Sequence, residues 1–168
     1  KTSNLKTKNM AERKNNPAAD GSDREIVVAR IFAAPRELVF SAWTDPRHVA
    51  NWWGPRGFST TTHEMDWRPG GTWRFIMHGP DGRDYPNHVR FTEIVKPSRM
   101  MHDHGGDDGK VLFQAEITLD DMGDRTRVTL RSVFATKDAR DLVVKEYGAI
   151  EGGKQTLARL DQYLAKTK

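Results

Sequence analysis

The apolar pattern of this chain changes once, and that change limits what the chain can fold into. Between residues 58 and 134 several segments have apolar residues at every second position, most regularly 111–119, which is the pattern of half-buried strands. From residue 137 to 165 they recur at helical spacing instead. A helix of up to about 28 residues is roughly 40 Å long, enough to cross a sheet. The pattern therefore predicts an antiparallel sheet whose single buried face is covered by the terminal helix.

The segment before this block predicts one further strand and two short helices. Residues 26–31 are mostly β-branched, and this run ends at Ala33-Ala34-Pro35 because proline cannot extend a central ladder. One short helix follows, and Asp45-Pro46 begins a second that Gly54-Pro55 ends. We therefore expect an α+β fold: one strand, two short helices, six strands and one long helix, with about seven strands in all.

Composition excludes several classes of function. The chain has 168 residues, no cysteine and no long apolar run, so we expect one domain without disulfides, thiolate metal sites or membrane insertion. No apolar signal segment follows the charged N-terminus, and we expect a cytoplasmic protein. The net charge is +4, but residues 1–22 hold five bases and two acids, which leaves +1 on the other 146 residues. Nucleic-acid binding needs bases clustered on the folded part, so we expect none.

Residues 1–22 differ from the remainder of the chain. They are polar and rich in Asn and Lys, so they bury too little apolar surface to offset the entropy of ordering. We expect a disordered tail here, followed by one domain over residues 23–168. Because the chain begins with Lys, part of this tail could be non-native.

Five short motifs, spread over residues 24–165, resemble a known family. They are Ala34-Pro35-Arg36-Glu37-Leu38-Val39-Phe40, Trp43-Thr44-Asp45-Pro46, Trp52-Trp53-Gly54-Pro55, Arg68-Pro69-Gly70-Gly71 and Glu151-Gly152-Gly153-Lys154. Together they resemble the SRPBCC superfamily of START-like and birch-pollen-allergen-like proteins. Within it, the chain is similar to bacterial proteins related to the C-terminal domain of the heat-shock-protein-90 ATPase activator.

The resemblance implies a helix-grip fold, in which a curved antiparallel sheet wraps around the long C-terminal helix and encloses a deep, mostly apolar cavity. It implies a lipid, polyketide or aromatic metabolite as ligand, or a chaperone partner in a stress response. Relatives of the activator domain carry Trp where this chain has Gly153. If position 153 faces inward, the resemblance implies a larger cavity here.

The predicted binding site is the lining of this cavity. Its residues are Trp53, Trp73, Phe75, Met77, Tyr85, His88, Phe91, Met101, Phe113, Leu142, Glu146, Ile150 and Gly153. The inward aromatics fit plain core packing and cavity lining equally well. Glu146 lies on the apolar helical stripe, so it either reaches solvent at the stripe's edge or anchors a ligand.

Other features have a structural and a functional interpretation. Trp52 and Trp53 either act as a structural plug that anchors the short helix or close the opening of the pocket. The structural plug is favoured, and Trp53 is the better candidate for a pocket residue. Gly148, Gly152 and Gly153 each cost about 1 kcal/mol in a helix, which indicates close packing on the sheet or room for a ligand.

His102-Asp103-His104 could supply two imidazoles to a metal, but the neighbouring Gly-rich loop favours a solvated loop end. We therefore expect no metal and no cofactor.

Three functions remain open at this point. Binding of a hydrophobic small molecule, oriented by one or two polar groups, accounts best for inward aromatics and a Gly-interrupted helix. A chaperone-associated partner-binding module is the second hypothesis. An enzyme is the third and least favoured, because no nucleophile–base pair or pair of carboxylates can be argued from spacing.

Overall fold

The computed structural model describes residues 23–167, so the predicted tail at 1–22 lies outside the described residues. The elements are β1 (Glu25–Phe32), α2 (Arg36–Thr44), α3 (Pro46–Val49), β2 (Ser59–Met65), β3 (Thr72–His78), β4 (Asp84–Val95), β5 (Arg99–Gly105), β6 (Val111–Asp121), β7 (Thr126–Phe134), α4 (Lys137–Tyr147) and α5 (Ala149–Thr167). This order confirms the predicted one of a strand, two short helices, six strands and a helical C-terminal segment.

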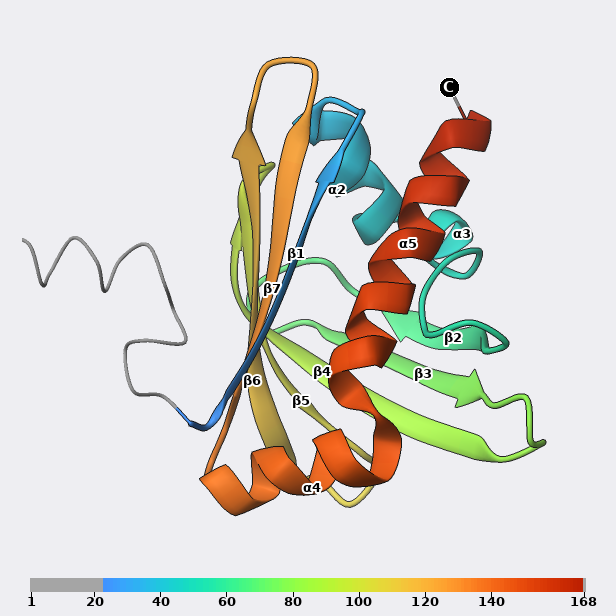
Figure 1. The fold of residues 1–168 in the computed structure, drawn as a ribbon, viewed down its shortest axis with the longest axis vertical. Helices are drawn as coiled ribbons and strands as arrows, with labels where there is room; N and C mark the ends of the chain where they lie inside the picture. The colour runs from blue at the N-terminus through green and yellow to red at the C-terminus, as the bar shows by residue number, and fades with distance from the viewer. Residues whose placement is uncertain (1–22, 168) are drawn as a thin grey trace, which may run out of the picture.

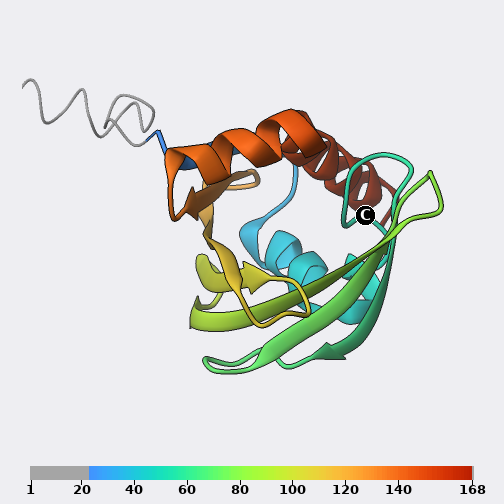
Figure 2. The same ribbon diagram turned by 90° about the horizontal axis from the view of Figure 1, so that it is seen from below.

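The seven strands form one antiparallel sheet with the order β1-β7-β6-β5-β4-β3-β2. Figures 1 and 2 show the sheet curving around α5, with α2 and α3 inside one end of the curve. The predicted helix-grip fold is confirmed. None of the helices in residues 23–167 combines the length and the apolar character that crossing a membrane requires.

Strand register determines which side chains face the helices. The pairs Met100–Ile117, His102–Ala115 and His104–Phe113 place alternate residues of β5 and β6 on the concave face. Between β4 and β5 the register shifts after Phe91, as at a β-bulge. In the turn before β3, Arg68 forms an ion pair with Asp66, with Arg68 Nε 2.7 Å from Asp66 Oδ2.

The terminal helical segment departs from the prediction of one continuous helix. Gly148 adopts a left-handed conformation with φ +58°, and its N–H donates to the carbonyl of Val144. Glycine reaches this conformation without the steric cost that a Cβ adds, and it commonly ends a helix. The segment therefore divides into α4 and α5, which meet at an angle (Figure 1). α5 buries Leu157, Leu160 and Leu164, whereas α4 has no buried residue.

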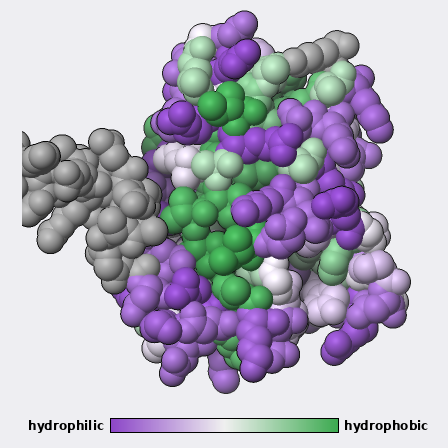
Figure 3. Space-filling view, viewed as in Figure 1, coloured by the Kyte–Doolittle hydropathy of each residue, from purple (hydrophilic) through white to green (hydrophobic). Residues whose placement is uncertain are grey.

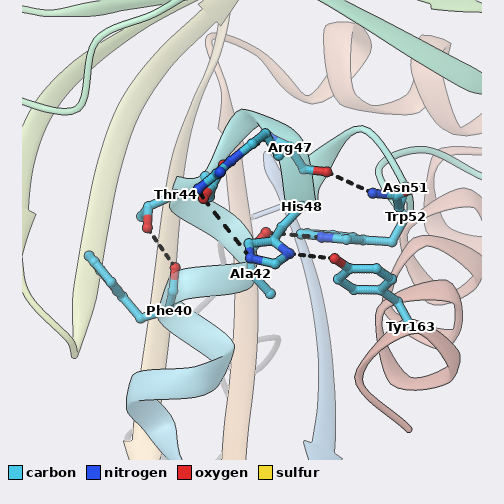
Figure 4. A network of polar contacts seen from close by, with 9 residues as sticks. Phe40, Ala42, Thr44, Arg47, His48, Asn51, Trp52 and Tyr163 are labelled. Carbon is cyan, nitrogen blue, oxygen red and sulfur yellow. Dashed lines mark hydrogen bonds and ion pairs between the residues drawn. The ribbon is translucent and has the colours of Figure 1, made fainter. Parts of the chain in front are cut away.

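The end of the molecule that holds α2 and α3 is filled by aromatic rings. Trp43 and Trp52 pack edge to face with ring centroids 4.8 Å apart, and both are almost completely buried. Trp52 Nε1 donates to the carbonyl of Ala42 at 3.1 Å, so its one polar group is satisfied (Figure 4). Trp52 is the structural plug that the sequence predicts.

Candidate functional site

The concave face of the sheet carries about half of the predicted lining residues. Trp73, Phe75 and Met77 of β3, Tyr85 and Phe91 of β4, and Phe113 of β6 share it through the strand register. Trp53 joins them from the turn after α3, edge to face with Trp73 at 5.2 Å and with Phe75 at 6.2 Å.

These side chains divide into a filled part and a partly open part. Trp73, Phe75 and Phe91 are buried to 2% exposure or less, and Trp73 stacks on Phe75 with centroids 3.9 Å apart. Met77, Tyr85 and Phe113 of the same face are only partly buried. The first group therefore has the environment of ordinary core residues, and the second group is where the face still meets solvent.

Two predicted lining residues lie on the opposite face of the sheet. Val89 and Phe91 point inward on β4, and successive residues of a strand alternate, so His88 points outward. On β5 the inward methionine is Met100, which is completely buried. Met101 faces outward, where Arg99 Nη2 approaches its sulfur at 2.9 Å. Placing these two side chains in the lining was therefore wrong.

The predicted lining residues of the helical segment are exposed. Leu142 is 56% exposed, Ile150 is 38% exposed, and Glu146 is also exposed. For Leu142 and Glu146 the break at Gly148 is the physical reason, because it rotates the residues before it off the stripe that α5 buries. Ile150 follows the break and lies in the first turn of α5, ahead of the buried residues of that helix. For Glu146 the solvent-facing alternative is the observed one.

Gly153 brings α5 close to the edge strand β1. A Cβ built on it would lie 3.2 Å from Cγ2 of Val28. Val28 fills the volume that a larger side chain would take, so close backbone packing is the observed alternative at this position. The larger cavity implied by the loss of Trp here is not observed.

Two histidines that the sequence indicates as a solvated loop end are buried on the concave face. His102 and His104 are 5% and 8% exposed, and both lie within β5. The ring of His104 stacks on Phe113 at 4.7 Å, and its Nε2 lies 2.7 Å from Oδ1 of Asn87. His102 and His104 follow Met100 at every second position, which places all three on one face of a strand, and this was the sequence signal for burial. The nearby glycines suggested instead that the strand ends before the histidines.

Burial determines the protonation of this pair. Desolvation lowers the pKa of His102 to about 4. Desolvation and the neighbouring His102 together lower the pKa of His104 to about 3. Both imidazoles are therefore neutral at pH 7. Nδ1 of His102 is buried without a hydrogen-bond partner in the described chain. Among residues 23–167, no group of three potential ligands is arranged to hold a metal.

One inward residue of β7, the strand next to the edge strand β1, is not fully covered. Leu130 of β7 lies between Val28 of β1 and Ile117 of β6, which are 7% and 3% exposed. Leu130 itself is only partly buried, and so is Ser132, the next inward residue of β7. Side chains at the centre of a filled interior are fully buried. Leu130 therefore packs against the core and still keeps part of its surface in contact with solvent.

Solved structures share this fold over almost the whole chain. The protein NE0264 from Nitrosomonas europaea is 26% identical, with 87% of this chain and 97% of that chain covered and a TM-score of 0.79. A protein from Rhodobacter sphaeroides is 28% identical, with coverages of 88% and 97% and a TM-score of 0.77. An HSP90 activator from Plasmodium falciparum is 18% identical, with coverages of 67% and 74% and a TM-score of 0.51, which shows a likeness of fold alone.

Among curated proteins, none matches this chain. Residues 33–165 match the family described as "Activator of Hsp90 ATPase homolog 1-like protein". This match includes both short helices, β2 to β7, α4 and nearly all of α5. The chain therefore belongs to the Activator of Hsp90 ATPase homolog 1-like family.

Proposed function

We propose that this protein binds an apolar small molecule with one hydrogen-bonding group, between the concave face of the sheet and helices α4 and α5. The partial exposure of Leu130 between two buried neighbours is the observation that carries the proposal. When a ligand covers apolar protein surface that is in contact with water, the free energy of binding becomes more favourable by about 25 cal/mol for each Å² covered. The space beside Leu130 is therefore a favourable place for apolar surface.

The wall beside this space is aromatic and adaptable. Phe113 contacts the ring of Phe134 at 5.2 Å, and Met77 and Tyr85 lie further along the concave face. All but Phe134 are partly buried. Aromatic faces and a flexible thioether accept flat or irregular apolar molecules. These contacts support a ligand of the lipid, polyketide or aromatic-metabolite kind.

The buried histidines supply the polar part of the recognition. A buried polar group without a partner costs about 1–3 kcal/mol, and Nδ1 of His102 is such a group. Because His102 is neutral, a hydroxyl or a carbonyl on the ligand can pair with its ring, depending on the tautomer. A charged ligand group gains no ion pair there. This favours a neutral polar group over a carboxylate.

The α4 end provides the way in. Val111 and Leu112 of β6 and Leu142 and Tyr147 of α4 expose more than half of their surface. Figure 2 shows α4 on one side of this end of the sheet and the turn between β5 and β6 on the other. Because α4 buries no residue and is joined to α5 through Gly148, displacing it breaks few contacts. An apolar ligand passing here meets apolar side chains.

The test combines an uncharged fluorescent probe, N-phenyl-1-naphthylamine, with two matched variants. Leu130→Phe fills the proposed space, whereas Ile117→Phe adds a comparable ring at a filled neighbouring position. We expect Leu130→Phe to change the free energy of unfolding by less than about 0.5 kcal/mol and Ile117→Phe to lower it by about 1–3 kcal/mol. Probe fluorescence should rise with the wild type and fall strongly with Leu130→Phe. Equal destabilisation by both variants would show that no space exists beside Leu130.

A partner protein is the second candidate, and one surface favours it. Figure 3 shows apolar side chains gathered in a band along β1, where Val27 and Ile31 are 37% and 42% exposed on an edge strand. Exposed apolar surface of this kind is found at sites of protein contact. Stimulation of the ATPase of a heat-shock-protein-90 chaperone, lost on Val27→Asp, would support this candidate, and no stimulation at high molar excess would end it.

A further inference from the structure

A polar hollow lies at the end of α5 furthest from α4. It has a volume of about 310 Å³ between α5 and the turn that follows α3. Its lining residues are Asn51, Arg159, Gln162, Tyr163 and Lys166. None of them belongs to the concave face described above, so the hollow is separate from the proposed apolar site.

The geometry of α5 gathers these side chains on one face. Arg159, Tyr163 and Lys166 are spaced by four and three residues, which places them in line along a helix. Tyr163 is fixed at the centre of this line, because its hydroxyl hydrogen-bonds to Nδ1 of His48 on α3 (Figure 4). The hollow therefore has an ordered wall.

Arg159 is held by neutral acceptors only. Its Nη1 donates to the carbonyl oxygens of Trp53, Gly54 and Pro55, at 3.2, 2.9 and 3.1 Å. These contacts fix the guanidinium against the Trp53–Pro55 turn without neutralising its charge. Desolvation lowers the pKa of Arg159, as expected for a partly buried cation without a counter-ion.

In the part of the chain that the structure describes, the two cations of the hollow have no acidic partner. Within residues 23–167, no carboxylate lies within ion-pair distance of Arg159 or Lys166. Asp161 is near in sequence, but it pairs with Arg30 of β1 at 3.1 Å. Two uncompensated cations beside a phenol and two amides form a donor-rich hollow.

We propose that this hollow binds a small anion, either a phosphate or a carboxylate group of a small molecule. Arg159 offers a planar, pre-positioned fork and Lys166 a mobile point charge, which is a common pairing for such oxygens. Gln162 and Asn51 add amide groups at the rim. The site lies apart from the neutral His102 region, so the two sites select opposite kinds of ligand group.

The test uses the ¹⁵N-labelled full chain titrated with inorganic phosphate and, separately, with acetate. Phosphate or acetate should shift the signals of Asn51 and the side chain of Arg159, and leave those of Leu130 unchanged. The anion that binds more tightly assigns the group, phosphate or carboxylate. No shift of the Asn51 and Arg159 signals with either anion would overturn the proposal.

A matched pair of lysine variants separates this site from general surface charge. Lys166→Gln removes one cation of the hollow, and Lys154→Gln removes an exposed lysine of α5 outside it. We expect Lys166→Gln to weaken anion binding about five- to tenfold, and Lys154→Gln to leave it within about twofold. Equal weakening by both variants would contradict a defined site. Tyr163→Phe, which keeps the ring, provides a second variant and should weaken binding less than Lys166→Gln.

Discussion

The two ends of the interior are built in opposite ways. At the α2–α3 end, Trp43 and Trp52 are buried and in edge-to-face contact, and the indole N–H of Trp52 donates to the carbonyl of Ala42. At the α4 end, the helix has partly buried residues but no fully buried one, and Leu142 and Tyr147 are exposed. The first end stabilises the fold, and in the proposed function the second end admits the ligand. A single sheet can serve both because its long curved strands reach from one end to the other.

The α4 end is held mainly by local contacts. Thr136 Oγ1 accepts from the N–H of Ala139 at the start of α4, and Gly148 ends it. Such capping bonds are each worth about 1 kcal/mol. A helix held by its caps and a few partly buried side chains opens at a lower free energy than the whole domain. The contrast with the aromatic end leads to four measurable differences.

The largest expected effect is at the aromatic end. Trp52→Ala removes a fully buried indole and its hydrogen bond to Ala42, so we expect a loss of about 3–5 kcal/mol in the free energy of unfolding. Urea denaturation measures it. Tyr147→Ala removes an aromatic ring of the α4 end and should cost less than about 0.5 kcal/mol. Similar losses in the two variants would remove the distinction between the ends.

The next effect is a dependence on pH caused by the buried histidines. The folded-state pKa of His102, about 4, lies below the unfolded value of 6.5. The unfolded chain therefore takes up protons first, and stability is complete above pH 6.5 and lost as the pH falls toward 4. For His102 alone, roughly 3 kcal/mol should be lost between pH 7 and pH 4.

Urea denaturation midpoints at several pH values, compared between variants, measure the contribution of His102 to the loss of stability in acid. His102→Leu should flatten the acid side of the stability curve. His63→Gln, at an exposed position of β2, is the matched control. Because burial also lowers the pKa of His104, part of the acid slope should remain in His102→Leu. A slope as steep as that of the wild type would contradict the contribution of His102.

A smaller effect is expected at the joint between α4 and α5. Gly148→Ala places a Cβ on a backbone with φ +58°, which costs roughly 1–2 kcal/mol. The cost should appear as faster amide hydrogen exchange in α4, with exchange in the sheet changed little. Gly152→Ala is the matched control, since its Cβ would make an ordinary 3.4 Å contact with Pro55. It should stabilise α5 by up to about 1 kcal/mol.

The smallest effect concerns a side chain that the sequence assigns to the lining. Leu142→Ser changes a residue that is 56% exposed, so the free energy of unfolding should change by less than about 0.5 kcal/mol. Because Leu142 belongs to the proposed entrance, the association rate of N-phenyl-1-naphthylamine should fall in stopped-flow fluorescence. A destabilisation above 2 kcal/mol would mean that α4 is packed as firmly as α5.

Period-two patterns predicted the inward residues well where a strand is long and regular. Phe113 and Ile117 on β6, and Trp73 and Phe75 on β3, lie on the face that alternation gives them. The pattern failed on β5, where Gly105 and Gly106 suggested a loop although the strand includes both histidines. Without the full length of the strand, its phase could not be fixed.

Other features depend on contacts that the sequence does not contain. The apolar spacing of residues 137–165 does not record that Gly148 takes a left-handed conformation, so the break between α4 and α5 was missed. The partial exposure of Leu130 depends on how α4 is placed over β7, which is a tertiary property. The polar hollow joins residues about 110 positions apart, such as Asn51 and Lys166, which local pattern cannot connect.

The most direct measurement of the central claim is a ¹³C-methyl NMR titration with N-phenyl-1-naphthylamine. The claim is that solvent-reached apolar space beside Leu130 takes up a ligand while the aromatic end stays closed. We predict that the Leu130 methyl signals shift on binding and that the Trp52 indole N–H signal stays in place. Unchanged Leu130 methyl signals at probe saturation, or a shift confined to the aromatic end, would contradict the account.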